Sequence, residues 1–281
     1  MVHVPVMVKE VISNLPKKLE LMMDWTIWHG GHSKAILSKF KEVKIIGVDR
    51  DEKILTKARE NLKDYEERVK LVCASYKDLE KILWSNKVDA ILLDLGVNME
   101  HFKDANRGFS IKHNGPLDMR FDNSGKITAR WILLNYSSDK LKEVFEKWGD
   151  FKWKVLDEIV AVIVKNRWKI KTTFDLKNVL KPVLSEKKLA VVFQALRIET
   201  NQELQQLEIF LKKFRNCLNE GGRCLIITYH SIEDRLVKNC FKDLDWRWFK
   251  NLTKKVIFPS WDEIKKNKPS RSAKLRVIEK I

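Results

Sequence analysis

The sequence predicts an α/β fold with a doubly wound parallel sheet, into which a helical region is inserted. Apolar runs of strand length alternate with segments of helical periodicity as far as residue 95. Strands and helices that alternate at this spacing form parallel sheets. From residue 127 to residue 200 the periodicity is helical, and beyond residue 201 the alternation returns. One α/β domain is therefore interrupted by a helical insertion.

The first part of the chain has a regular order of predicted elements. A short amphipathic helix places Val8, Val11, Ile12 and Leu15 on one side. Strands are predicted at 19–23, 44–49, 69–74 and 88–95, and helices at 33–41, 52–63 and 77–83. The strand over 88–95 is apolar enough to be buried on both faces, as in a parallel sheet covered by helices.

The second part of the chain begins where the alternation of strands and helices stops. Residues 96–126 are rich in Gly, Asn, Asp and Arg and predict a long functional loop. Helices are then predicted at 128–135, 138–147, 152–166, 173–181, 188–199, 201–218 and 232–241, with strands at 223–230 and 274–281. Residues 242–273 are basic and are predicted to be loop-like. The predicted domain boundaries are 1–102 and 206–281 for the two parts of the α/β domain and 103–205 for an inserted substrate-binding subdomain.

Charge is the strongest signal in the composition. The 281 residues include 55 Lys and Arg against 38 Asp and Glu, a net charge of +17. Such a balance indicates a polyanionic partner, most simply nucleic acid, although genomic base composition also produces Lys-rich surfaces. No apolar run approaches the roughly 20 residues of a membrane span, and the start lacks the form of a signal peptide. Four scattered cysteines without a C-x-x-C pair predict a cytoplasmic protein with reduced thiols and no metal site.

Residues 19–34 are the candidate binding site of a nucleotide-like ligand. A buried strand ends at Asp24, a tight loop follows, and a helix opens near Ser33. Asp49 and Asp94 also stand at the carboxyl ends of strands, where ligands bind in such sheets, and an acid after the second strand commonly holds ribose hydroxyls. Because neither G-x-G-x-x-G nor G-x-x-x-x-G-K-[ST] is present, S-adenosylmethionine is the best candidate. The alternative is an ordinary turn between a strand and a helix.

Nine short segments along nearly the whole chain resemble one enzyme family, the bacterial 16S rRNA cytosine-N4 methyltransferases (the RsmH or MraW family). They are His3-Val-Pro-Val6, Gly30-Gly-His-Ser33, Val48-Asp-Arg-Asp51, Leu92-Leu-Asp-Leu-Gly-Val97, Arg107-Gly-Phe-Ser110, Gly115-Pro-Leu-Asp-Met-Arg120, Phe193-Gln-Ala-Leu-Arg-Ile198, His230-Ser-Ile-Glu-Asp-Arg235 and Arg271-Ser-Ala-Lys-Leu-Arg276. The resemblance implies a class I (Rossmann-like) S-adenosylmethionine-dependent methyltransferase with an inserted helical subdomain. It further implies methylation of N4 of a decoding-centre cytidine, position 1402 of 16S rRNA in the small ribosomal subunit.

The resemblance also implies roles for individual residues. Those carried over to the cofactor are Gly30, Gly31, His32, Asp49, Tyr76, Asp94 and His101. Tyr76 stands where the family has an aromatic against the adenine, and His101 stands where many relatives have Gln. Candidate RNA contacts are Arg107, Arg120, Arg197 and Arg235, each of which could instead form a salt bridge within its own segment.

The chemistry requires alignment and the removal of a proton. The exocyclic amine of cytosine is a weak nucleophile because its lone pair is delocalised into the ring, and the base must leave its stack. Asp94, Asp118 and His230 are the candidates that polarise or deprotonate N4, and the residues leave the choice between them open. The alternatives are a turn-capping role for Asp118 and a structural role for His230.

Tryptophan stands where the family pattern requires small residues. The opening loop has Trp28 at a required glycine and Trp25 at a position that is commonly small, so the loop as written should bind cofactor poorly. Trp84, Trp168 and Trp261 also occupy glycine-like places, and the chain has ten Trp and only ten Gly. We hypothesise that the gene uses UGA for glycine and was translated with UGA as tryptophan. UGG codons at positions 25 and 28 would refute this, and real divergence is the alternative.

Two other functions remain to be weighed. A methyltransferase fold without activity could serve as an RNA-binding or ribosome-assembly protein. A methyltransferase could also act on DNA, but the chain lacks the Asp/Asn-Pro-Pro-Tyr/Trp motif of the usual amino-methylating DNA enzymes after the strand at 88–95.

Overall fold

The computed structural model describes residues 4–75, 78–83, 86–97, 99–122, 125–149 and 151–281. The chain divides into two compact units, Met1–Gly96 with Gln205–Ile281, and Val97–Leu204. We call them the sheet unit and the helical unit and describe each by itself.

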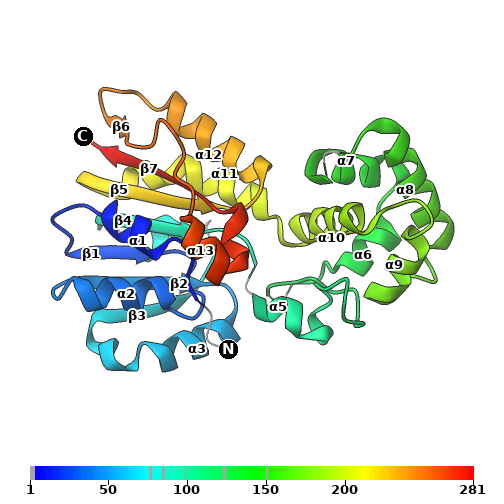
Figure 1. Ribbon diagram of the computed structural model, residues 1–281, viewed down its shortest axis with the longest axis horizontal. Coiled ribbons are helices and arrows are strands. Elements are labelled where there is room, and N and C mark those ends of the chain that lie inside the picture. Colours follow the sequence, from blue (N-terminus) through cyan, green and yellow to red (C-terminus); the bar gives the residue numbers. More distant parts are fainter. Residues whose placement is uncertain (1–3, 76–77, 84–85, 98, 123–124, 150) are drawn as a thin grey trace. The chain divides into compact units, whose positions relative to one another are not determined.

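The sheet unit contains a seven-stranded sheet in the order β3-β2-β1-β4-β5-β7-β6 (Figure 1). The strands are β1 Leu21–Asp24, β2 Lys44–Asp49, β3 Val69–Cys73, β4 Val88–Asp94, β5 Leu218–Thr228, β6 Phe249–Asn251 and β7 Lys274–Lys280. β1 to β5 pair in parallel, whereas β7 runs antiparallel to β5 and β6 antiparallel to β7. This order with a reversed β7 is that of class I methyltransferases, and the predicted fold class is confirmed.

Helices cover both faces of this sheet. They are α1 Val8–Ser13, α2 Gly31–Lys39, α3 Glu52–Asn61, α4 Leu79–Leu83, α11 Glu203–Lys213, α12 Ser231–Asp243 and α13 Trp261–Lys266. One apolar cluster joins α1, α2 and α3 to the central strands, with Ile36 and Leu55 packed among residues such as Leu92. A second layer is aromatic, where Phe210 stacks on Phe214 at 5.6 Å. Burial of these side chains holds the carboxyl ends of the strands in fixed positions.

One prediction for this unit is wrong, and one predicted helix has different bounds. The segment 242–273 is not a continuous loop, because it contains β6 and α13. A three-residue strand is too short to produce a periodic pattern, and α13 is a short helix capped by the Ser260 side chain. The helix predicted over 201–218 begins at Glu203 and gives way to a 3-10 turn at Phe214, because Gln202 has a left-handed φ of 51° that ends the preceding helix.

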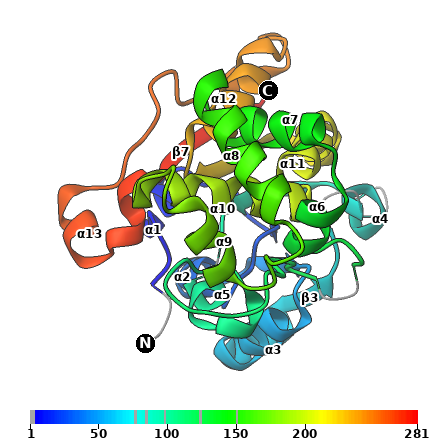
Figure 2. The same cartoon turned by 90° about the vertical axis from the view of Figure 1, so that its right-hand side faces the viewer.

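The helical unit contains α5 Met99–Lys103, α6 Ala129–Asn135, α7 Ser138–Gly149, α8 Trp153–Asn166, α9 Thr173–Leu180 and α10 Glu186–Asn201. α8 packs between α7 and α9, and α10 packs on α6 and α7 (Figure 2). Thr172 and Asp175 form a capping box at the start of α9. No helix among the described residues has the length and apolar character needed to cross a membrane.

Candidate functional site

Three aspartates end neighbouring strands of the sheet. Asp24 closes β1, Asp49 closes β2 and Asp94 closes β4, and these strands are adjacent in the order β2-β1-β4. Because the three strands are parallel, their carboxyl ends meet at one edge, as the sequence predicts. The loop from Trp25 to Gly30 and the start of α2 lie at the same edge.

Asp24 anchors the start of α2. Its carboxylate accepts a hydrogen bond of 2.6 Å from the Ser33 hydroxyl and is almost fully buried. Burial raises the pKa of Asp24, and the Ser33 hydrogen bond opposes that shift. Asp24 therefore joins β1 to α2.

Gly30 and Gly31 are both constrained by packing. Gly30 precedes α2 with a left-handed φ of 77°, and a Cβ there would come within 2.7 Å of Leu62. A Cβ at Gly31 would come within 2.9 Å of Pro5. These contacts require glycine for reasons internal to the protein. Cofactor contact by this glycine pair stays a prediction.

His32 is buried beside the acids. Its Nε2 lies 2.7 Å from the carbonyl oxygen of Val6, so Nε2 carries a proton and donates it. Burial lowers the pKa of His32 and favours the neutral ring, which leaves Nδ1 unprotonated. Nδ1 lies 3.8 Å from Oδ2 of Asp94.

Asp94 is the carboxyl group best suited to proton transfer. It is 3% exposed, and the Tyr229 hydroxyl donates a hydrogen bond of 2.7 Å to its Oδ1. Burial raises the pKa of Asp94 to about 7, against the lowering effect of the Tyr229 hydrogen bond. A base with a pKa near the working pH is efficient in proton transfer. Sequence reasoning missed Tyr229, although a tyrosine at the end of a strand next to His230 is a usable signal.

Asp49 holds the opening loop. Its Oδ1 accepts a hydrogen bond of 3.0 Å from the Asp51 amide, and its Oδ2 accepts one of 3.3 Å from the Trp28 amide. Burial raises the pKa of Asp49 to about 7. The carboxyl group stands at the second strand end, where a ribose hydroxyl pair would be held.

Trp28 lies across the strand ends. Its φ is 47°, in the left-handed region that favours glycine, and its indole Nε1 donates a hydrogen bond of 3.1 Å to the Asp94 carbonyl oxygen. The side chain therefore bridges from the loop beside Asp49 to the end of β4. The acids and the α2 N-terminus are polar groups of the kind that bind S-adenosylmethionine, and the Trp28 indole lies at the same edge of the sheet.

The other tryptophans behave differently. Trp25 is buried and packs on Phe210, with ring centroids 6.4 Å apart. Trp168 has no positive φ, and Trp261 is the first residue of α13, so neither has the backbone of a glycine position. Among the tryptophans within the described residues, a left-handed backbone occurs at Trp28 alone. Trp84 lies outside the described residues, as does Tyr76.

His230 caps α12. Its Nδ1 accepts a hydrogen bond of 3.4 Å from the Glu233 amide, and its Nε2 lies 3.0 Å from the Glu233 carboxylate. This geometry supplies the structural role that sequence reasoning weighed as the alternative to catalysis. Arg235 is exposed on the same helix. Its neighbour Asp234 pairs with Arg276 at 2.7 Å.

The remaining candidates belong to the helical unit. Arg120 pairs with Asp118 at 2.6 Å, and Arg107 donates hydrogen bonds to the carbonyl oxygens of Arg120 and Phe121. Arg197 makes two hydrogen bonds to Glu203, at 2.8 and 3.0 Å. His101 is buried and stacks on Phe109, with centroids 5.1 Å apart. Asp118 and three of the four candidate arginines therefore have partners inside the chain, and their RNA or catalytic roles stay predictions.

No group of three or more His, Cys, Asp or Glu side chains that could hold a metal ion occurs within the part of the chain that the structure describes. The edge of the sheet thus offers protonatable carboxyl groups, a helix start and a tyrosine donor. This arrangement can bind a polar ligand and accept a proton.

Comparison with known proteins assigns the family. The model of the MraW methylase family matches residues 1–281. "Ribosomal RNA small subunit methyltransferase H" of Elusimicrobium minutum is 42% identical over 99% of this chain and 98% of its own length, and that of Pseudothermotoga lettingae is 39% identical over 99% of both. The solved structure of SMU.1697c from Streptococcus mutans in complex with SAH is similar at a TM-score of 0.48 and 16% identity, over 100% of both chains. The full-length match shows that the chain belongs to the MraW methylase family.

Proposed function

We propose that the protein is a methyltransferase of small-subunit ribosomal RNA that transfers a methyl group from S-adenosylmethionine to N4 of a decoding-centre cytidine, position 1402 of 16S rRNA. The family match and the names of the relatives support rRNA of the small subunit as the substrate. The net charge of +17 supports a nucleic-acid partner. An enzyme that acts on small ribosomal subunits works in the cytoplasm.

The observation that carries the N4 assignment is the environment of Asp94. S-adenosylmethionine, when bound, supplies a methyl group already activated by its sulfonium. The protein must then accept the proton that the exocyclic amine of cytosine loses as its new bond to the methyl group forms. Oδ1 of Asp94 is held by Tyr229, so Oδ2 is the oxygen that can accept this proton. With a pKa of about 7, the carboxylate is available around neutral pH.

We prefer Asp94 as the base because the other two candidates, His230 and Asp118, are engaged in contacts within the chain. Both nitrogens of the His230 ring face Glu233, where the ring caps α12. Asp118 is held by Arg120 through two short contacts of 2.7 and 2.6 Å. Both carboxylate oxygens of Asp118 therefore already accept hydrogen bonds from the Arg120 guanidinium.

Cofactor binding would involve Asp49, the Gly30-Gly31 turn, His32 and the carboxyl end of β4. Asp49 would take the ribose hydroxyls, and the free amide groups at the α2 N-terminus favour polar or anionic groups. The Trp28 indole must leave this edge first. Glycine at position 28 would remove that obstacle and would suit the left-handed backbone.

A second candidate function is favoured by Trp28 itself. If the indole stays across the strand ends, the protein would be an RNA-binding or ribosome-assembly factor that has lost transfer. Absence of cofactor binding even with glycine at positions 25 and 28 would support this alternative.

The test of the proposed function is nucleoside analysis of modified rRNA. Small subunits that lack the mark are incubated with S-adenosylmethionine and the protein carrying glycine at positions 25 and 28, and the digested rRNA is examined by mass spectrometry against standards. N4-methylcytidine is expected. A methyl group on a ring carbon, on a ribose or on another base would contradict the proposal.

A further inference from the structure

Glu233 is a buried acid in the first turn of α12 that the proposed chemistry does not use. It is 3% exposed, and a buried carboxylate is costly unless hydrogen bonds compensate it. Its Oε2 accepts a hydrogen bond of 2.9 Å from the Tyr229 amide and one of 3.4 Å from the His230 amide. The carboxylate therefore holds the main chain that joins β5 to α12.

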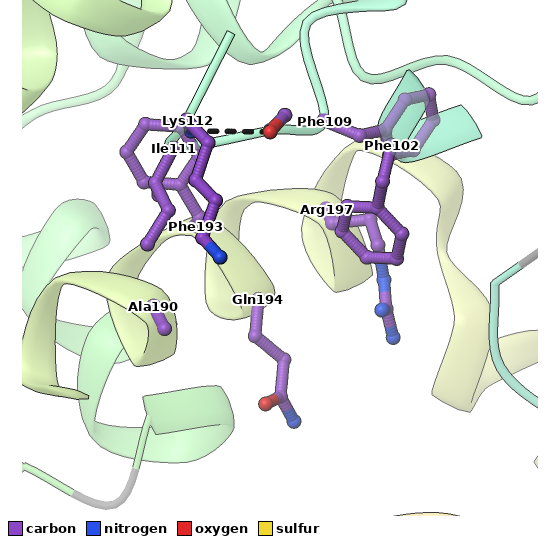
Figure 3. A pocket seen from close by; sticks show the side chains of 9 residues that line it. Phe102, Phe109, Ile111, Lys112, Ala190, Phe193, Gln194 and Arg197 are labelled. Carbon is purple, nitrogen blue, oxygen red and sulfur yellow. Dashed lines mark hydrogen bonds between the residues drawn. The ribbon is translucent and has the colours of Figure 1, made fainter. Parts of the chain in front are cut away.

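A carboxylate also orients a side chain in the helical unit. There Glu203 accepts two hydrogen bonds from Arg197, at 2.8 and 3.0 Å, and Figure 3 shows Arg197 at a cavity of about 420 Å³. The partner of that acid is a guanidinium, so the two charges form a pair. Glu233 holds main-chain amides and the His230 ring, and its negative charge acts, after burial, to raise the pKa of Asp94.

The main chain held by Glu233 carries the tyrosine that binds Asp94. The Tyr229 hydroxyl donates its hydrogen bond of 2.7 Å to Oδ1 of Asp94. Burial and the nearby Asp94 carboxylate raise the pKa of Tyr229, so the phenol stays protonated and donates. A Cβ on Gly96 would come within 3.2 Å of Cδ2 of the Tyr229 ring. The ring is therefore held by its backbone anchor and by close packing against Gly96.

We infer that Glu233 is a positioning residue for the methyl transfer, which fixes Tyr229 so that its phenol holds Oδ1 of Asp94 and leaves Oδ2 for the incoming proton. The inference rests on the proposed function, in which Asp94 is the base. Glu233 acts on Asp94 in two ways. Its hydrogen bonds keep the phenol on the carboxylate, and its charge disfavours ionisation of a second acid nearby.

Two other titratable groups face Asp94. Nδ1 of His32 on α2 lies 3.8 Å from Oδ2 of Asp94, and burial lowers the pKa of His32 and favours the neutral ring. Burial raises the pKa of Asp24 on β1, and the charge of Asp94 adds to that shift. A substitution at Glu233 changes neither group. A change in the pKa of Asp94 in such a variant therefore reports on Glu233 and Tyr229.

The first test is titration of Asp94 by carbon-13 NMR in the full chain without cofactor, labelled at Cγ of aspartate. The signal that is missing in Asp94→Asn identifies the residue. Glu233→Gln keeps an oxygen that accepts from the amides but removes the charge, so the midpoint should fall by about half a unit. Asp234→Asn is the matched control, because it removes the same charge one residue later from an acid that pairs with Arg276. Its midpoint should equal that of the parent.

The second test measures the positioning through methyl transfer to small subunits, in the Trp25→Gly, Trp28→Gly background at about pH 9, where Asp94 is ionised. Glu233→Ala loses the acceptor and should lower kcat about tenfold, whereas Glu233→Gln should stay within about threefold of the parent. In a Tyr229→Phe background, Glu233→Ala should lower kcat by less than about twofold, because the phenol that it positions is already absent. Circular dichroism checks that each variant is folded.

The results separate this inference from the proposed function. A midpoint of Asp94 that is unchanged in Glu233→Gln, or that moves equally in Asp234→Asn, overturns the inference. Equal losses of kcat in Glu233→Ala and Glu233→Gln, or a full tenfold loss in the Tyr229→Phe background, also overturn it. The titration needs neither cofactor nor RNA. The expected midpoints without methyl transfer in any variant would refute the proposed function alone, whereas methylation of N4 with an unmoved midpoint would refute the role of Glu233 alone.

Discussion

Replacing Trp28 with glycine is predicted to increase the affinity for S-adenosylmethionine. The indole lies between the Asp49 and Asp94 strand ends, where its Nε1 binds the Asp94 carbonyl oxygen at 3.1 Å. A ligand that binds beyond the strand ends must displace it. Glycine removes the side chain and accepts the φ of 47° without strain.

The size of the affinity change follows from the free energy needed to displace the Trp28 indole. Breaking the hydrogen bond of the indole costs about 1 kcal/mol. Exposing roughly 100 Å² of the half-buried ring costs about 2.5 kcal/mol at ~25 cal/mol/Å². The sum of about 3–4 kcal/mol corresponds to a dissociation constant lower by a factor of about 10² to 10³ in Trp28→Gly. The free energy of unfolding should fall by about 1–3 kcal/mol, because relief of about 1–2 kcal/mol of left-handed strain offsets only part of the lost contacts.

Isothermal titration calorimetry with S-adenosylmethionine is the assay. Trp168→Gly is the matched control, since Trp168 is 76% exposed and far from the strand ends in sequence, and its dissociation constant should equal that of the parent. An unchanged dissociation constant in Trp28→Gly would refute the steric reasoning. Equal gains in both variants would show a general effect of removing tryptophan.

Three further predictions concern protons and packing. The pKa of Asp94 is about 7 in the folded protein, against an ordinary 3.8. The stability that the protein has below pH 4, where Asp94 is protonated in both states, is therefore lost progressively as the pH rises to 7. The free energy of unfolding of Asp94→Asn, measured in urea, should therefore rise relative to that of the parent by about 2–3 kcal/mol from pH 5 to pH 8. A difference between the two proteins that does not change with pH would contradict this. Tyr229→Phe removes a donor to the carboxylate and should move the rise of kcat/KM with pH upward by about one unit, whereas an unmoved midpoint would exclude Asp94 as the base. Gly108→Ala should lower stability by more than about 2 kcal/mol, since its Cβ would overlap the Pro116 carbonyl oxygen. Gly221 has a similar φ but open space around it, so Gly221→Ala should lower stability by only about 1 kcal/mol. Thermal melting measures both.

The strands and their parallel sheet could be predicted where apolar runs are long. β2 and β4 are continuous apolar segments between helices with clear periodicity, and such patterns specify a parallel sheet. β6 has three residues and joins the sheet by pairing with β7, so a contact distant in sequence determines it and no local pattern marks it. The break at Gln202 depends on a left-handed residue that is not glycine, which local propensity disfavours.

The residues of the site could be predicted from the sequence, but many of their contacts could not. Acids at strand ends are visible in the sequence, and Asp24, Asp49 and Asp94 do meet at one edge. Asp24 anchors α2 through Ser33, and Tyr229, the residue after β5, reaches Asp94; both depend on contacts between different elements. Such long-range hydrogen bonds leave no periodic signal.

The most direct test of the account is transfer of labelled methyl groups from S-adenosylmethionine to small ribosomal subunits that lack the mark. The protein with Trp25 and Trp28 is compared with the Trp25→Gly, Trp28→Gly double variant. Label is expected on the decoding-centre cytidine with the double variant, and little label with the tryptophan form. Absence of label with both would contradict the proposed methyltransferase function and favour a non-catalytic RNA-binding protein.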